Sequence, residues 1–230
     1  RLFAFNIKDK KMSLLFRFYE PDNLEISEIN DRHDIKILNV DETGNITFMV
    51  YGYMNRGVHE GKVGVAVYTY NSLSSVVSEQ VYIPYGKSYD VLKTDIEKLS
   101  YINRNNKLYL SLEKAIYEID ITEKTYDVLA TELETGEYKI SDTGRMVVWQ
   151  DSIKNDYTAK KLYLMDLSTE EIMGIEAEKN ECIKALGFVG EDFVYGLAYE
   201  EDIVVNENDE MMFYMHSVLI QNETGIILKQ

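Results

Sequence analysis

The sequence predicts an all-β protein: a β-propeller-like array of four-stranded antiparallel blades, incomplete in this chain, with one short helix near residues 88–98. The first observation is a short apolar strand that ends in Asn, Asp or Gln. It returns roughly every 50 residues, which is the period of a four-stranded propeller blade. The second is a strand–turn–strand phrase whose turn contains Gly or Asn, the residues that tolerate the positive φ of tight turns. The apolar strand recurs at residues 2–6, 67–71, 116–120, 162–166 and 217–221, and the strand–turn–strand phrase at 37–50, 101–110, 138–149 and 185–195.

These strands divide into one half blade and four fuller repeats. Residues 1–19 hold two strands joined by a lysine-rich turn, and the fuller repeats lie at about 33–84, 99–133, 137–178 and 182–230. Propellers hide the edges of their sheets by closing into a ring. Four and a half blades do not form a closed ring by themselves. We therefore expect a single propeller region that is a fragment of a larger chain. The half blade would be completed by the remaining blades of that parent polypeptide or by another copy.

One segment departs from the strand pattern. Tyr89, Leu92, Ile96 and Leu99 fall at helical spacing, and Ser88 before them is a suitable N-cap. The pattern predicts a short helix that packs its apolar stripe on the sheet edges, with a partner-binding helix as the alternative.

The composition limits the partners. The chain has 24 Lys and Arg against 40 Asp and Glu, for a net charge of −16. A field of that sign repels phosphate backbones, so we expect no nucleic acid. The sequence has no long apolar run of the length that spans a bilayer, so we expect no direct membrane insertion in this segment. Phosphate loops, dinucleotide fingerprints and nucleophile elbows are absent as motifs, and we expect no cofactor and no catalytic residue.

The repeats resemble those of bacterial β-propeller proteins of the TolB type. The residues that carry this resemblance are the turns at 141–145 (Ser-Asp-Thr-Gly-Arg) and 41–45, followed by strands that end in Tyr-x-x-Asp. Residues 51–57 also resemble a stretch in uncharacterised, membrane-tethered extracytoplasmic proteins of Gram-positive anaerobes. These likenesses imply a propeller fold and a bacterial cell-surface location, tethered by a segment outside this chain. They carry over no functional residue, because fold alone does not specify function.

The richest candidate for ligand binding is the loop at residues 51–61. It gathers aromatic, basic and acidic side chains between glycines that let the backbone turn sharply or approach a ligand. The candidate residues are Tyr51, Tyr53, Asn55, Arg56, His59 and Glu60. The alternative is a long hairpin tip in which Arg56 and Glu60 satisfy each other.

A second candidate pair, His33 and Asp34, stands just before the first strand of the same repeat. A histidine beside carboxylates can bind a metal or move protons near neutral pH. The spacing to His59 matches no established metal-ligand pattern, so we predict no metal site and a ligand-binding role for this pair. The alternative is a histidine that caps the backbone at the strand entrance.

These observations favour a non-catalytic binding or sensing module of an extracytoplasmic bacterial protein. Its ligand would be a protein, a peptide or a glycan. Two alternatives stay open. One is a propeller accessory or carboxylate-based hydrolase domain, and the other is a scaffold for protein–protein assembly.

Overall fold

The computed structural model describes residues 1–18, 31–133, 138–150, 159–208 and 210–230. Residue 19, where the predicted half blade ends, and residue 137, where the third fuller repeat begins, lie outside the described residues. The chain divides into two compact units. The first comprises Arg1–Lys98, Asn105–Glu113 and Glu118–Asp127, and the second Leu99–Arg104, Lys114–Tyr117 and Val128–Gln230.

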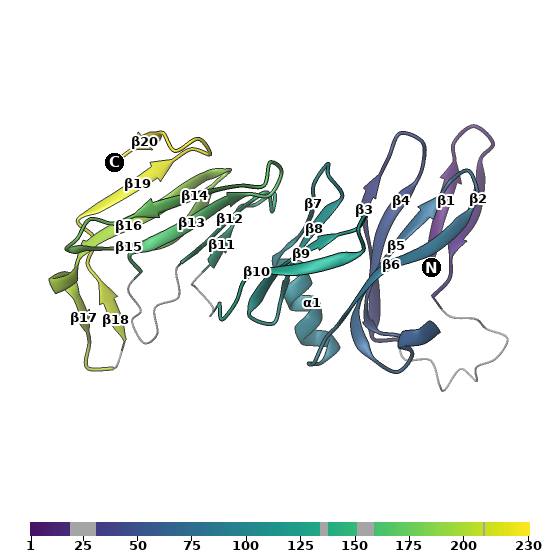
Figure 1. Ribbon diagram of the computed structural model, residues 1–230, viewed down its shortest axis with the longest axis horizontal. Coiled ribbons are helices and arrows are strands. Elements are labelled where there is room, and N and C mark those ends of the chain that lie inside the picture. Colours follow the sequence, from purple (N-terminus) through teal and green to yellow (C-terminus); the bar gives the residue numbers. More distant parts are fainter. Residues whose placement is uncertain (19–30, 134–137, 151–158, 209) are drawn as a thin grey trace. The chain divides into compact units, whose positions relative to one another are not determined.

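The prediction of an all-β chain built from four-stranded antiparallel sheets is confirmed (Figure 1). Within the described residues, four sheets have four strands each in sequential order, apart from one inserted hairpin. They are β3 (His33–Val40), β4 (Ile46–Tyr53), β5 (Val63–Asn71) and β6 (Val76–Pro84); β7 (Ser100–Ile102), β8 (Lys107–Leu112), β9 (Ala115–Asp120) and β10 (Thr125–Ala130); β11 (Tyr138–Ile140), β12 (Met146–Gln150), β13 (Lys161–Asp166) and β14 (Glu171–Glu176); and β15 (Glu181–Val189), β16 (Asp192–Tyr199), β19 (Ser217–Gln221) and β20 (Ile227–Lys229).

Two smaller sheets in the described part of the chain have two strands each. Strands β1 (Leu2–Asn6) and β2 (Lys11–Phe16) form a hairpin at the N-terminal end. Strands β17 (Ile203–Val205) and β18 (Met211–Phe213) form an arm between β16 and β19. Short 3-10 turns lie at Gly57–His59 and Glu200–Asp202.

The predicted helix is confirmed as α1 (Tyr89–Lys98). Its apolar stripe is buried at Leu92 and Ile96, as helical spacing requires of a stripe that faces a core. Asp95 is buried beside this stripe and accepts hydrogen bonds from the Tyr85 hydroxyl at 2.7 Å and from the backbone N–H of Glu113 at 2.8 Å. None of the described helices is both long enough and apolar enough to cross a membrane.

Most third strands end in a polar residue whose side chain closes the turn to the fourth strand. The Oδ1 atom of Asn71 accepts hydrogen bonds from the backbone N–H groups of Leu73 and Ser74, at 3.1 and 2.9 Å. Equivalent bonds to the N–H two residues further on are made by Asn6, Asp120 and Asp166. Short Asn and Asp side chains favour turns because they reach the backbone this way. The hydrogen bonds to the turn explain why the recurring strand usually ends in Asn or Asp.

The same turns bring a residue other than glycine to positive φ. It stands four positions after the polar residue in each copy: Lys10 (φ 51°), Ser75 (56°), Lys124 (60°) and Glu170 (68°). The last repeat differs because its strand ends in Gln221, whose longer side chain does not make this bond. Instead, Asn222 accepts from the N–H groups of Thr224 and Ile226, and Gly225 has φ 88°.

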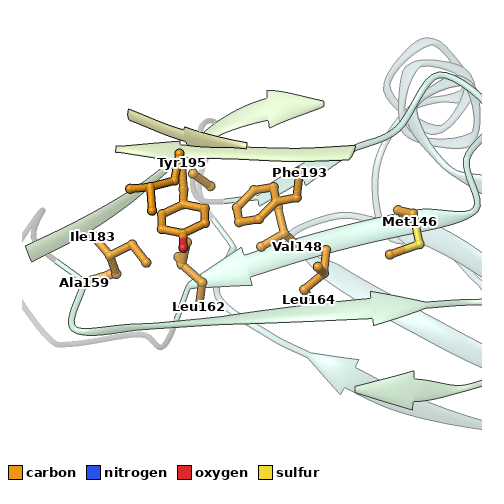
Figure 2. Packing of buried hydrophobic residues seen from close by; sticks show 10 residues of the cluster. Met146, Val148, Ala159, Leu162, Leu164, Ile183, Phe193 and Tyr195 are labelled. Carbon is orange, nitrogen blue, oxygen red and sulfur yellow. The ribbon is translucent and has the colours of Figure 1, made fainter. Parts of the chain in front are cut away.

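The second strand of each four-stranded sheet is the most deeply buried. Its apolar residues are consecutive, because side chains on both faces of the strand are covered. In the second unit, β12 and β13 pack against the sheet that contains β15, β16 and β19 (Figure 2). Phe193 and Tyr195 of β16 face Val148, Leu162 and Leu164 in this core.

We expect Asn71→Ala to lower the free energy of unfolding by about 1 kcal/mol, because the N–H groups of Leu73 and Ser74 lose their acceptor. Chemical denaturation of the purified protein measures this change. Leu73→Ala in the same turn is the matched control, since Leu73 is 95% exposed and should change stability little. Equal effects of the two substitutions would contradict the role given to the Asn71 side chain.

Candidate functional site

The structure brings four of the eight predicted site residues together at one end of strands β3 and β4. His33 lies opposite Gly52 and Asp34 lies opposite Tyr51 in this antiparallel pair. The Nδ2 atom of Asn55, which is buried, lies 3.1 Å from Nδ1 of His33. An amide nitrogen donates, so this bond requires an unprotonated Nδ1 on the imidazole.

Asp34 holds helix α1 to this sheet. Its Oδ2 atom accepts hydrogen bonds from the Tyr89 hydroxyl at 2.7 Å and from Nζ of Lys93 at 3.0 Å. The hydrogen bond from Tyr89, and then the bond and charge of Lys93, hold the pKa of Asp34 below its ordinary value of 3.8. Burial, followed by the bond to Asp34, raises the pKa of Tyr89. Each of these shifts favours the arrangement in which the carboxylate is ionised and the phenol keeps its proton.

Gly52 is required here by the protein's own backbone. It has φ +120°, and a Cβ atom on it would lie 2.4 Å from the carbonyl oxygen of Arg32 and 2.9 Å from the Tyr89 ring. The sequence suggested that this glycine permits close approach of the backbone to a ligand. In the structure the close approach is to β3 and α1.

The remaining loop residues contact other parts of the first unit. Arg56 donates a hydrogen bond to the carbonyl oxygen of Arg17 at 2.7 Å. His59 stacks on the Tyr82 ring, with centroids 3.6 Å apart, and its Nε2 atom lies 3.1 Å from Oε1 of Glu79. These contacts, unlike the suggested Arg56–Glu60 pair, are with residues far along the sequence.

Tyr53 is half-buried and Glu60 is exposed. The structure therefore brings Tyr51, Asn55, His33 and Asp34 together, while Arg56 and His59 have separate partners elsewhere in the first unit. Among the described residues, no three His, Cys, Asp or Glu side chains are placed where they could hold a metal ion.

A different cluster of charges lies in the second unit, around Arg145. The Arg145 guanidinium forms an ion pair with Glu223, and its Nε atom lies 3.5 Å from Glu191 and 3.7 Å from Asp166. Glu191 also accepts hydrogen bonds from the Thr143 hydroxyl at 2.7 Å. One partly buried cation thus holds three carboxylates from three different turns.

A hollow of about 590 Å³ lies next to this cluster. Its lining includes the buried residues Met146 and Leu164, which also belong to the core shown in Figure 2. Ile172 and Met173 of β14 add further apolar surface. Polar groups line the rest of the hollow: Asp166, Thr169, Glu171, Glu223 and Thr224. Its volume falls within the range of small-molecule and side-chain pockets.

A second hollow of about 600 Å³ lies at the base of the β17–β18 arm and is lined by Asn180, Tyr199, Glu200 and Glu201. Its walls interact mainly with the protein itself. Glu200 forms an ion pair with Lys160, and His216 stacks on Tyr199 with ring centroids 4.4 Å apart. Compared with the first hollow, its lining includes little aliphatic surface.

The sequence reasoning missed the hollow beside Arg145, although part of the signal was present. Residues 222–225 (Asn-Glu-Thr-Gly) repeat the turn seen at residues 41–44 and 141–144. In the structure, the turns that hold Arg145 and Glu223 face each other. The ion pair itself joins residues of different repeats, which no local pattern indicates.

Comparisons with known proteins reach only the level of fold. No protein family model and no curated protein matches the chain. The solved structures to which the chain is similar include Porphyromonas gingivalis dipeptidyl peptidase 4 (TM-score 0.30, 8% identity, 83% of this chain) and oligogalacturonate lyase from Vibrio parahaemolyticus (TM-score 0.30, 12% identity, 81% of this chain). The chain spans 38% and 58% of their respective lengths. At these TM-scores the resemblance carries no argument about what this chain does.

Replacing Asp34 by Asn should make stability depend less on pH. Because the folded state lowers the pKa of Asp34, its ionised form stabilises the fold above pH 3.8, and this contribution is lost as the pH falls through the lowered value. We expect Asp34→Asn to cost about 0.5–1 kcal/mol at pH 7, after allowance for solvent screening, and progressively less towards pH 3.

Urea unfolding at several pH values measures this difference. Asp31→Asn is the control, because Asp31 is exposed and its side chain makes no contact that would hold α1. A cost for Asp34→Asn that is the same at pH 7 and pH 3 would refute the assignment.

Proposed function

We propose that this chain is a non-catalytic binding or sensing module and that its ligand enters the hollow beside Arg145. The observation that carries the proposal is the composition of that hollow, whose lining combines the buried apolar residues Met146 and Leu164 with three carboxylates. Binding sites commonly combine apolar walls with a few placed polar groups. The loop at residues 51–61 supports the proposal less, because Arg56 and His59 already contact the protein itself.

The chemistry of the hollow favours a ligand that is both cationic and apolar. Asp166, Glu171 and Glu223 line it, together with Ile172 and Met173. Arg145 offsets part of this negative charge, but Glu171 is exposed and makes no ion pair with a described residue. A lysine or arginine side chain of a peptide fits this pattern, because its stem packs on apolar surface while its charge meets carboxylates.

A glycan fits the hollow less well. Sugar rings are usually bound by stacking on aromatic side chains, and the residues that line the hollow include none. Trp149, the one tryptophan of the sequence, is buried and stacks on Tyr163 with ring centroids 5.7 Å apart. Among the expected ligand classes, we therefore propose a peptide with basic and apolar residues.

The proposal includes an extracytoplasmic location at a bacterial cell surface, with the chain tethered by a segment outside it. The support for this part is the resemblance of residues 51–57 to membrane-tethered proteins of Gram-positive anaerobes. An acidic surface also suits a module that attracts basic peptides from solution.

Thermal-shift screening with short peptides tests the ligand class. We expect peptides that alternate Lys with Leu to raise the melting temperature, while matched Glu–Leu peptides and neutral oligosaccharides do not, because a ligand of the folded state stabilises it by mass action. Glu171→Gln should weaken the Lys–Leu peptide roughly two- to fivefold in a titration.

Glu123→Gln is the matched control for net charge, since Glu123 lies in an exposed turn of the first unit. The proposal fails if no basic peptide binds, or if both substitutions weaken binding equally, because that result would indicate only the overall charge of the protein.

A further inference from the structure

Two of the three carboxylates around Arg145 are fixed by other hydrogen bonds. The carboxylate of Glu191 accepts from the hydroxyls of Ser141 and Thr143, at 3.1 and 2.7 Å. The Oδ1 atom of Asp166 accepts from the backbone N–H and the hydroxyl of the residue two positions further on, at 2.8 and 2.6 Å. Both carboxylates are therefore held in place independently of Arg145.

Glu223, the third carboxylate, is held differently. In the described part of the chain its side chain is bonded only to Arg145, and it is 47% exposed. It stands in the turn at residues 222–225, which is closed by the side chain of Asn222. Glu223 also lines the hollow. It can therefore turn from the guanidinium to a ligand without losing any other bond that the structure gives it.

Arg145 has one donor that is not used. Its Nε atom is buried and has no hydrogen-bond acceptor within the described residues, although carboxylate oxygens of Glu191 and Asp166 lie 3.5 and 3.7 Å away. These distances exceed that of a normal hydrogen bond by little, so a small rotation of the guanidinium would let Nε donate to one of them. A buried donor without an acceptor is costly, and this rotation would remove the cost.

We propose that Glu223 is the specificity-determining residue of the hollow, and that it exchanges Arg145 for the cationic group of the ligand. This inference rests on the proposed function. Arg145 occupies Glu223 in the free protein, and its Nε atom moves to Glu191 or Asp166 when a ligand takes Glu223. A neutral or acidic ligand cannot replace the guanidinium, so the exchange favours ligands that carry a positive charge.

The exposure of the Arg145–Glu223 pair sets the size of the effect. The two side chains are 29% and 47% exposed, and ion pairs with this access to water contribute modestly. We therefore expect Arg145 to reduce the affinity for a cationic ligand about two- to fivefold and not to prevent binding.

Titration with the Lys–Leu peptide tests this competition. We expect Arg145→Gln to tighten binding of the peptide about two- to fivefold, because Glu223 is then available to the ligand from the start. Lys87→Gln is the matched control for net charge, since Lys87 is exposed in the first unit, and it should change the affinity little.

Glu191→Gln separates the exchange from a simple effect of charge. Glu191 is not among the residues that line the hollow, but it is one of the two acceptors for Nε of Arg145. Its loss should weaken the peptide about twofold, because Arg145 then holds Glu223 more firmly, and should have no effect when Arg145→Gln is also present. If Glu191 acted through its charge alone, the two backgrounds would show the same loss.

NMR of the Arg145 side chain gives a direct readout. On addition of the Lys–Leu peptide, the Nε–H signal should shift and should exchange more slowly with water, because Nε gains an acceptor. This measurement uses the unsubstituted protein, so it does not depend on how the variants fold.

The outcomes distinguish this inference from the proposed function. Absence of binding to the unsubstituted protein and to every variant would contradict both. Binding that Arg145→Gln weakens or leaves unchanged would contradict only the exchange. An Nε–H signal that does not respond to the bound peptide would contradict the exchange as well.

Discussion

The turn that connects the third and fourth strands in most of the sheets is the interaction on which the rest of the fold depends. A single Asn or Asp side chain, such as Asn71 or Asp120, accepts the N–H groups that would otherwise be unbonded at the tip. The turn fixes the register of the two strands, and a slip of one residue would reverse which side chains face the core. This local contact helps to position the consecutive apolar residues of the second strands. Those residues in turn form the packing between sheets.

The sequence predicts those parts of the structure that depend on local patterns. The alternation within residues 67–71 and the Thr-Gly turn at 143–144 indicate strands and their connections, and helical spacing indicates α1. Long-range pairing of side chains is not visible in this way. Nothing near Arg56 in the sequence points to the carbonyl oxygen of Arg17, and nothing near Asn55 points to His33. The ligand-binding role of these residues stays a prediction, and the partners that the structure gives Arg56 and Asn55 are far from them in the sequence.

Several cationic side chains of this acidic protein form ion pairs with carboxylates on neighbouring strands and turns. Arg145 gathers carboxylates from three turns, and Lys107 and Lys161 each pair across strands with a glutamate at 2.8 Å. With 24 cationic side chains for 40 acidic ones, many carboxylates must remain in water. Partly buried pairs of this kind keep their strength in salt better than exposed pairs do. Arg145, Lys107 and Lys161 thus each link two or more strands or turns.

The closing turn has a consequence for how such repeats can diverge after duplication. Because one side chain at the end of the strand supplies the acceptor, the residues that follow it are free to vary, and they do: Lys8 and Asp9 in one copy, Ser168 and Thr169 in another. Thr169 lies in the lining of the hollow beside Arg145. Point substitutions at such positions could therefore change the lining of that hollow while the hairpin stays intact. The ligand that the hollow binds could then change during evolution without a change of fold.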